Sequence, residues 1–154
     1  MDLRLREATG PDADIIADFN AAMAAETEGI ALDRARLDRG VRAVLADRSK
    51  GFYLVAELDG EIVAQTLITY EWSDWRNGVF WWIQSVYVKP EFRGRGVFTR
   101  IYEYVAGLAR DSGSVCGLRL YVEHENQRAQ RTYERLGMRR TVYHMYEADF
   151  VIER

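Results

Sequence analysis

Two short dipeptides, each flanked by apolar segments, constrain the fold of this chain more than any other sequence feature. Asp59-Gly60 separates the apolar segments 52–58 and 61–70, and Asn77-Gly78 precedes a third segment, 79–88. Asp-Gly and Asn-Gly favour the positive φ angles of tight turns between antiparallel strands. The sequence therefore predicts three consecutive antiparallel strands.

The remaining segments predict helices and further strands around these three. Four segments predict helices, because they carry apolar residues at helical spacing or helix-capping residues. They are 9–23, 33–47, 97–110 and 126–137. Three more segments favour strands, and they are 3–7, 118–122 and 141–151. The predicted order is βααβββαβαβ, ending in one strand or a hairpin. We expect an α/β (α+β) fold with a mixed, mostly antiparallel sheet flanked by helices.

Length and composition exclude several classes of protein. The 154 residues suit one domain, 1–154, and 21 basic against 24 acidic residues give a net charge of -3. This balance argues against nucleic-acid binding but suits an acidic pocket for a cation. Cys116 is the only cysteine and there are two histidines, so we expect neither a disulfide nor a metal site. With no membrane-spanning run and no signal peptide, we expect a cytoplasmic protein.

A glycine turn, Arg93-Gly94-Arg95-Gly96, joins a strand to a helix. Its glycines let the backbone approach a ligand, and the first N–H groups of the helix lack intrahelical acceptors. Together with the helix dipole and two arginines, they favour a phosphate or pyrophosphate. A plain strand–helix connection would use the same glycines. The nucleotide-binding motifs do not fit, because Thr99 replaces the third glycine of G-x-G-x-x-G and no P-loop is present.

The turn and a second motif resemble the GNAT family of N-acetyltransferases. The family signature is Arg or Gln, two residues, Gly, one residue and a small residue, which the segment 93–98 matches except at Phe98. The segment 86–90 resembles the strand and proline before that signature. Asn126-x-x-Ala129-x-x-x-Tyr133-x-x-x-Gly137 resembles the family's next motif. The resemblance extends over about 52–146 and implies a GNAT-like fold.

The resemblance also implies acetyl-CoA as the donor substrate. Main-chain N–H groups of the turn would hold its pyrophosphate, and the preceding strand would pair with the pantetheine arm like an added strand. Asn126 would contact CoA as well as cap its helix. The implied acetyl-CoA-binding residues are Val86, Tyr87, Val88, Arg93, Gly94, Arg95, Gly96, Val97, Phe98, Thr99 and Asn126.

The resemblance further implies that Tyr133 is the catalytic general acid. A phenol with a pKa of about 10 can protonate a departing thiolate, whose thiol has a pKa of about 8.5. Taken alone, a tyrosine on an amphipathic helix is more often a core residue. The spacing of the motif favours the acid.

The base that takes the proton of the amine stays open. Polyamine-type members of the family often carry a glutamate where this chain has Gln84, which is not a base. Gln84 could instead orient a water or the substrate. The alternatives, acting directly or through water, are Glu26, Glu28, Glu71, Asp74, Glu123 and His124.

Aromatic and acidic residues indicate where an acceptor would bind. The aromatic residues of two neighbouring strands, which are Tyr70, Trp72, Trp75, Phe80, Trp81 and Trp82, alternate between the two sheet faces. One set would pack under helices, and the other would line an acceptor site or a dimer surface. Glu26 and Glu28, expected between the first two helices, would attract a cation together with Glu71 and Asp74. A solvated charge cluster fits the same residues equally well. The predicted substrate-binding residues are Glu26, Glu28, Glu71, Trp72 and Gln84.

These residues predict an acetyl-CoA-dependent N-acetyltransferase. The acceptor would be a primary amine of a small molecule, such as a polyamine or an amino-acid-like metabolite, which attacks directly in a ternary complex. We expect a homodimer. A protein lysine or N-terminus is the alternative acceptor, and a non-catalytic acyl-CoA-binding regulatory module is the alternative class.

Overall fold

The strands of the computed structural model, which describes residues 1–153, form a five-stranded sheet in the order β1-β2-β3-β4-β5. Neighbouring strands are antiparallel except β5, which is parallel to β4. Two compact units are present: Met1–Tyr121, which holds the sheet, and a second unit from Val122 onward. The elements are β1 (Arg4–Glu7), α1 (Ala13–Glu28), α2 (Arg34–Ala46), β2 (Phe52–Leu58), β3 (Glu61–Ser73), β4 (Gly78–Val88), α3 (Val97–Ser112), β5 (Val115–Arg119) and, in the second unit, α4 (Gln127–Arg135).

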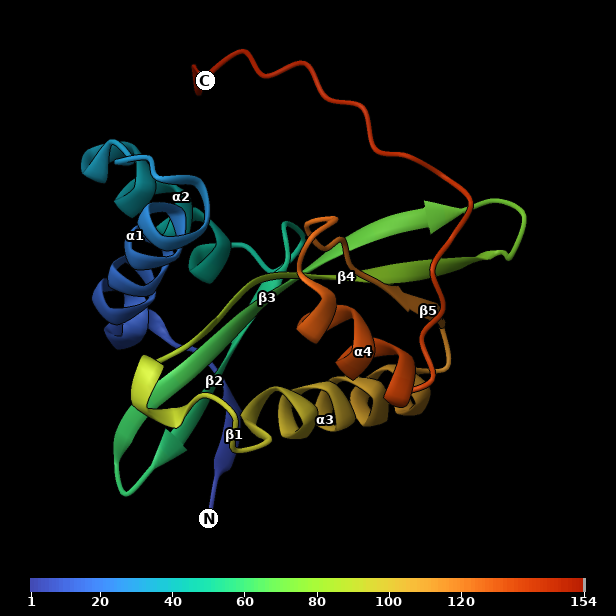
Figure 1. The fold of residues 1–154 in the computed structure, drawn as a ribbon, viewed down its shortest axis with the longest axis horizontal. Coiled ribbons are helices and arrows are strands. Elements are labelled where there is room, and N and C mark those ends of the chain that lie inside the picture. The colour runs from blue at the N-terminus through green and yellow to red at the C-terminus, as the bar shows by residue number, and fades with distance from the viewer. Residues whose placement is uncertain (154) are drawn as a thin grey trace. The chain divides into compact units, whose positions relative to one another are not determined.

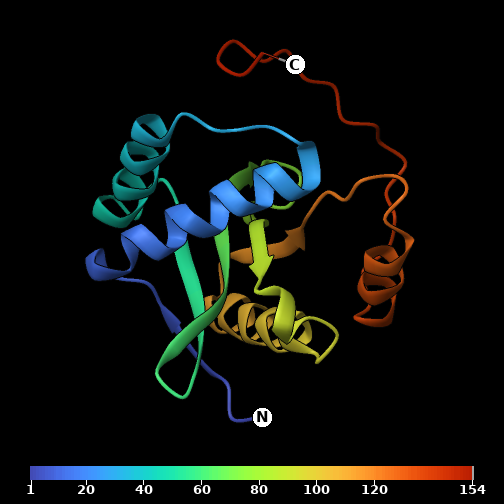
Figure 2. The ribbon, with the colours of Figure 1, turned by 60° about the vertical axis from the view of Figure 1, so that its left-hand side comes forward.

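Helices cover both faces of the sheet in the first unit. Helices α1 and α2 lie on one face and α3 on the other, as Figures 1 and 2 show. Because alternate residues of a strand face opposite sides, Val55 packs with Ile16 and Val41 under the first two helices. Leu54 belongs to the core under α3, together with Ile101. The predicted mixed sheet flanked by helices is confirmed.

The two turn dipeptides behave differently. Asp59 and Gly60 both have positive φ angles, 52° and 80°, and form the two-residue turn between β2 and β3. The β3–β4 hairpin is also present, but Ser73 pairs with Gly78, so its loop has four residues and Gly78 lies in the strand. A Cβ at Gly78 would lie 3.0 Å from the Cβ of Cys116. The missing Cβ of Gly78 therefore permits close packing against β5, a role separate from the turn.

Helix α1 is longer than the sequence pattern indicated. We expected Glu26 and Glu28 between the two early helices, but both lie in the last turn of α1. The alanine-rich segment 21–25 favours continued helix, because alanine has the highest helix propensity. Gly29, with a φ of 65°, ends the helix in the left-handed conformation.

The predicted strand or hairpin at 141–151 is wrong for the described residues, where this segment is extended chain without strand pairing. A strand needs a partner for its main-chain groups, and no described strand of the second unit lies beside 141–151. Near its end the side chain of Asp149 accepts hydrogen bonds from the main-chain N–H groups of Val151 and Ile152, which makes a local turn and no hairpin. Val142, Met145 and Phe150 are exposed.

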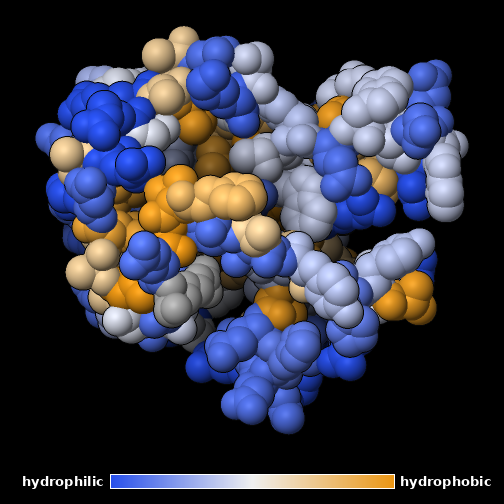
Figure 3. Space-filling view, turned by 90° about the horizontal axis from the view of Figure 1, so that it is seen from above, coloured by the Kyte–Doolittle hydropathy of each residue, from blue (hydrophilic) through white to orange (hydrophobic). Residues whose placement is uncertain are grey.

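Figure 3 shows apolar and polar side chains side by side on the surface viewed from above. No helix within residues 1–153 is long and apolar enough to cross a membrane.

An ion-pair cluster joins β1 to the start of α1. The guanidinium of Arg6 lies 2.7 Å from Oδ2 of Asp12 and 2.8 Å from Oε1 of Glu57. The main-chain N–H of Thr9 also donates to Oδ2 of Asp12, at 2.8 Å, as part of a capping box. The hydrogen bond from Arg6 lowers the pKa of the nearly buried Asp12 carboxyl.

Replacing Asp12 with Asn should lower the free energy of unfolding at neutral pH by about 1–3 kcal/mol, because it removes a charge-assisted acceptor. A carboxyl whose folded pKa is lowered stabilises the fold above its ordinary pKa of 3.8, and this contribution is lost as the pH falls through the folded pKa. Denaturant titrations of both proteins should therefore converge in strong acid. Asp14→Asn is the matched control, since Asp14 forms an exposed pair with Arg42. An equal penalty at every pH would contradict this account.

Candidate functional site

A bulge interrupts β4 in the middle of the sheet. Leu67 pairs with Gln84 and Gln65 pairs with Tyr87, so β4 has one more residue than β3 between these pairs. Ser85 has a φ of 49°, which is rare for a residue other than glycine. The extra residue shifts the alternation of side chains, so that Gln84 and Tyr87 both face the α1 side.

Beyond its first residues, β4 has no strand partner on the β5 side. The register between β4 and β5 begins at Val79 with Val115 and ends at Trp82 with Arg119. The stretch 83–88 therefore presents one edge that no strand of the sheet in residues 1–153 pairs with. An extended ligand can pair with main-chain groups along such an edge.

The glycine turn follows this open edge. After the short 3₁₀ turn Pro90–Phe92, Gly94 and Gly96 have φ angles of 74° and 77°. Gly96 is the N-cap of α3, and no side chain caps the first N–H groups of this helix. A Cβ at Gly96 would meet nothing within 4 Å. The uncapped helix start therefore faces open space, which suits an anion.

The two arginines of the turn have different environments. Nε of Arg93 donates to the carbonyl of Val88 at 2.8 Å, and its guanidinium pairs with Glu26 at 2.8 Å. The side chain of Arg93 thus fastens the turn to β4 and to α1. Arg95 is exposed, lies over the ring of Phe92 at 5.6 Å, and forms no ion pair within residues 1–153. Arg95 is therefore the arginine better placed to meet an added anion.

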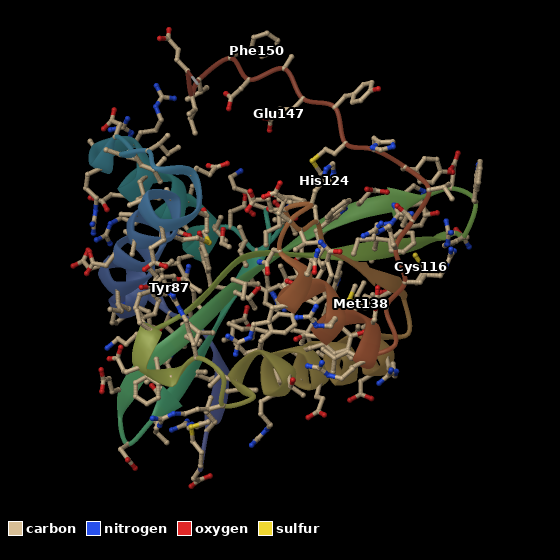
Figure 4. The ribbon with its side chains drawn as sticks, in the orientation of Figure 1. Tyr87, Cys116, His124, Met138, Glu147 and Phe150 are labelled. Atoms are coloured by element: carbon tan, nitrogen blue, oxygen red, sulfur yellow. The ribbon has the colours of Figure 1, made fainter. Side chains whose placement is uncertain are left out.

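Tyr87 completes the cluster around Arg93 and Glu26. Its ring packs against Phe19 with centroids 4.9 Å apart, and Figure 4 shows it between α1 and the turn after β4. Its hydroxyl lies 3.5 Å from Oε1 of Glu26. Burial, and then the nearby Glu26 carboxylate, raise the pKa of Tyr87. Tyr87 therefore stays a neutral phenol beside the ion pair.

A second cluster lies toward the other end of β4. Glu71 accepts a hydrogen bond from Nε1 of Trp82 at 3.0 Å and pairs with Arg119 at 2.6 Å. The guanidinium of Arg119 stacks 3.7 Å above the centroid of Phe80. Because Glu71 and Trp72 are adjacent in β3, they face opposite sides of the sheet, and Trp72 is 64% exposed. The structure therefore brings Glu71 together with Trp82 and Arg119, but not with Trp72.

Other predicted residues of the first unit lie near these clusters. Val86 and Val88 belong to the open stretch of β4, and both contact the core under α3. Val97 is buried in the first turn of α3, which also holds Phe98 and Thr99. Two further predicted acidic residues belong to this unit, Glu28 in the last turn of α1 and Asp74 in the β3–β4 loop.

The remaining predicted residues belong to the second unit. Asn126 caps α4, since its Oδ1 accepts from the N–H of Ala129 at 3.1 Å. Tyr133 lies on α4 and is half-buried, and burial raises its pKa. The carbonyls of Glu123 and His124 accept hydrogen bonds from the side chain of Gln130. The predicted cap and helix are confirmed, and the catalytic role of Tyr133 stays a prediction.

Sequence reasoning missed two polar residues of β3 that lie beside the bulge. Gln65 and Thr66 have no exposed surface, yet their side chains hydrogen bond to carbonyls of β4. The signal was present, since Gln-Thr interrupts an otherwise apolar run at 62–68. A polar pair in a buried strand requires hydrogen-bond partners and so indicates a special site.

Comparison with known proteins defines the class. A family model described as the acetyltransferase (GNAT) family matches residues 16–138. The match spans most of the chain, and the chain belongs to the GNAT family of acetyltransferases.

Curated relatives resemble part of the chain. Thialysine N-ε-acetyltransferase from Bos taurus is 39% identical over 77 residues, which cover 49% of this chain and 44% of that protein. Its counterpart from Sus scrofa is 37% identical over 79 residues, covering 51% of this chain and 45% of that protein. This chain thus matches slightly less than half the length of either relative.

Solved structures resemble nearly the whole chain. A possible acetyltransferase from Clostridium difficile 630 has a TM-score of 0.88 and 47% identity, covering 97% of this chain and 99% of that one. A predicted acetyltransferase from Clostridium acetobutylicum, solved with acetyl-CoA, has a TM-score of 0.77 and 18% identity over 96% of both chains. The second likeness concerns the fold alone.

Proposed function

We propose that this chain is an acetyl-CoA-dependent N-acetyltransferase whose acceptor is a primary amine of a small molecule. One observation carries the proposal: the open edge of β4 leads directly into the uncapped start of α3 at Gly96. An extended arm that ends in a pyrophosphate matches this pairing of an edge with an anion site. Membership of the GNAT family supports acetyl-CoA as the ligand with that shape. The thialysine N-ε-acetyltransferases among the relatives support a small amine as acceptor.

The donor would lie along β4 and the turn. Main-chain groups of Val86 and Val88 would pair with the pantetheine arm, and the N–H groups at the start of α3 would hold the pyrophosphate. Arg95, which has no ion pair within residues 1–153, would add positive charge beside it. Arg93 would act mainly by holding the turn in place, since its guanidinium is engaged with Glu26 and Val88.

The transfer would proceed by direct attack in a ternary complex. The neutral amine nitrogen bonds to the thioester carbonyl carbon, and the carbon–sulfur bond breaks with its electron pair going to sulfur. The thiolate takes a proton from Tyr133, and the nitrogen loses its extra proton to a base, directly or through water. Glu71 and Glu26, each paired with an arginine, are candidate bases of the first unit. Gln84 would orient the acceptor or a water near the bulge.

The proposal is tested by measuring CoA release with purified protein, acetyl-CoA and a panel of polyamines, basic amino acids and peptides with free lysines or N-termini. Release with small amines, confirmed by the mass of the acetylated product, is the expected result. Release with peptides alone would move the acceptor to proteins. Acetyl-CoA binding by calorimetry without release across the panel would favour the regulatory module and contradict the enzyme.

Direct attack predicts that Cys116→Ala retains its turnover. Cys116 is half-buried in β5 and, as the only thiol of the chain, would be the carrier in any cysteine-based covalent mechanism. Initial rates of CoA release should match those of the wild type. Intact-protein mass spectrometry after quenching would detect an acetylated Cys116, and such an intermediate would refute direct attack.

A homodimer and a cytoplasmic location belong to the same proposal. The strongly exposed rings of Trp72 and Trp75, near the β3–β4 hairpin, support a surface that a second copy covers, since aromatic residues are enriched at interfaces. Sedimentation of the purified protein measures the state directly.

A further inference from the structure

Two fully buried polar side chains of β3 lie opposite the bulge of β4. Gln65 and Thr66 both have 0% exposure, in a strand whose neighbouring positions are apolar. Burying an amide or a hydroxyl costs free energy unless it is hydrogen bonded. Neither residue belongs to the proposed donor-binding or proton-transfer groups. Their hydrogen bonds therefore need a separate explanation.

Both side chains hold main-chain carbonyls of the bulge. Oγ1 of Thr66 donates to the carbonyl of Gln84 at 2.9 Å, and Nε2 of Gln65 donates to the carbonyl of Ser85 at 3.2 Å. A bulge disturbs the regular ladder between two strands. Here two side chains of one strand bind two consecutive carbonyls of the other at the position of the extra residue. They thereby fix the two peptide planes of the bulge.

Fixing a carbonyl also fixes the N–H of the same peptide. A trans peptide is planar, and its N–H points opposite to its C=O. The hydrogen bond of Gln65 to the Ser85 carbonyl therefore directs the N–H of Val86 away from Gln65. In the same manner, the hydrogen bond of Thr66 to the Gln84 carbonyl directs the N–H of Ser85 away from Thr66. Ser85 keeps its unfavourable φ of 49° because these contacts hold it.

The hydrogen bond of Gln65 to the Ser85 carbonyl leaves the amide oxygen of Gln65 without a hydrogen-bond partner among the described residues. Nε2 of Gln65 also donates to Oδ1 of the buried Asn20, at 3.1 Å. Since both neighbours are acceptors, the amide must present its NH₂ group to them, and Oε1 is left without a partner among the described residues. An unsatisfied buried acceptor costs about 1–3 kcal/mol. The chain tolerates this cost at the position that holds the bulge.

We propose that Gln65 and Thr66 are positioning residues for acetyl transfer, which keep the N–H of Val86 aimed at the carbonyl oxygen of the bound thioester. This inference rests on the proposed function. As the amine bonds to carbon, the carbonyl electron pair moves to oxygen, and it returns when the carbon–sulfur bond breaks. A donor that is already in place stabilises this oxyanion without reorganising. Gln65 and Thr66 supply that rigidity without touching the substrate.

The test compares Thr66→Val and Gln65→Met, which keep side-chain size but remove the donors, with the wild type. Each should lower kcat by about 10- to 100-fold while leaving the calorimetric Kd for acetyl-CoA nearly unchanged. Thr66→Ser restores the hydroxyl and should restore kcat. Thr69→Val is the matched control, because Thr69 lies in the same strand but pairs with Trp82, ahead of the bulge.

Three outcomes would overturn the inference while leaving the proposed function standing. One is a kcat of Thr66→Val no lower than that of Thr69→Val. Another is a loss of acetyl-CoA affinity in the two donor-removing variants as large as their loss of kcat. The third is a Thr66→Ser variant with a normal Tm whose kcat is not restored, which would indicate a packing role only. A wild type that binds acetyl-CoA but acetylates no amine would instead refute the proposed function, and the inference with it.

Discussion

Replacing Tyr133 with Phe is expected to lower kcat by about 100-fold or more while changing the Kd for acetyl-CoA little, since a positioned general acid typically contributes 10²- to 10⁴-fold. The substitution removes only the phenolic oxygen and keeps the ring, so packing within the second unit should persist. Turnover with the best amine of the panel, together with calorimetric binding of acetyl-CoA, measures the two effects separately. Tyr146→Phe is the control, because Tyr146 is 94% exposed in the same unit.

The pH dependence of kcat gives a second measure of the same role. Burial raises the pKa of Tyr133 above its ordinary value of 10.0, so the proton-donating form is present at neutral pH and is lost only as the pH rises through the raised pKa. The wild type should therefore lose activity in strong alkali, and Tyr133→Phe should lack that decline. Unchanged turnover in Tyr133→Phe would show that another group protonates the thiolate.

The second large effect is expected for Gly96→Ala, which should weaken acetyl-CoA binding about 10- to 100-fold, the equivalent of one lost charge-assisted hydrogen bond. Gly96 has a φ of 77° at the start of α3, and its missing Cβ faces open space rather than protein. An added methyl group would therefore occupy the approach to the helix N–H groups. Left-handed geometry costs a residue with a Cβ about 1–2 kcal/mol in addition.

Gly113→Ala separates these two contributions. Gly113 lies at the other end of α3, has a φ of 73°, and also has nothing within 4 Å of its missing Cβ. Both variants should lose similar unfolding free energy, measured by denaturant titration, but only Gly96→Ala should lose acetyl-CoA affinity. Equal affinities in the two variants would show that the start of α3 does not hold the pyrophosphate.

Local signals predicted the parts of the fold that depend on neighbouring residues. Asp59-Gly60 predicted its turn because positive φ angles favour these residue types. Asp33 and Asn126 cap their helices through their own side-chain oxygens, which needs no distant partner. The strand predicted at 118–122 was shifted, and β5 begins earlier at Val115, where it pairs with β4.

Distant contacts explain what the sequence could not predict. Arg93 reaches Glu26, which lies 67 residues away, so a side chain expected to serve the phosphate is instead engaged with α1. The bulge at Ser85 has no local signature, because its φ is maintained from β3. The segment 141–151 has the composition of a strand but no partner within its unit. In each case tertiary contacts, or their absence, decide the conformation.

On its β5 side, strand β4 is paired along only part of its length, and this also bears on aggregation. An unpaired strand edge is a template onto which other chains can add, and natural proteins shorten, bend or interrupt such edges. In β4 the unpaired stretch is short, is bent at Ser85 and is followed by Pro90, which cannot donate to a ladder. A foreign polypeptide strand would find few consecutive groups in register there. A narrow, flexible ligand arm needs far fewer, so the same edge can admit a small molecule and discourage intermolecular sheet growth.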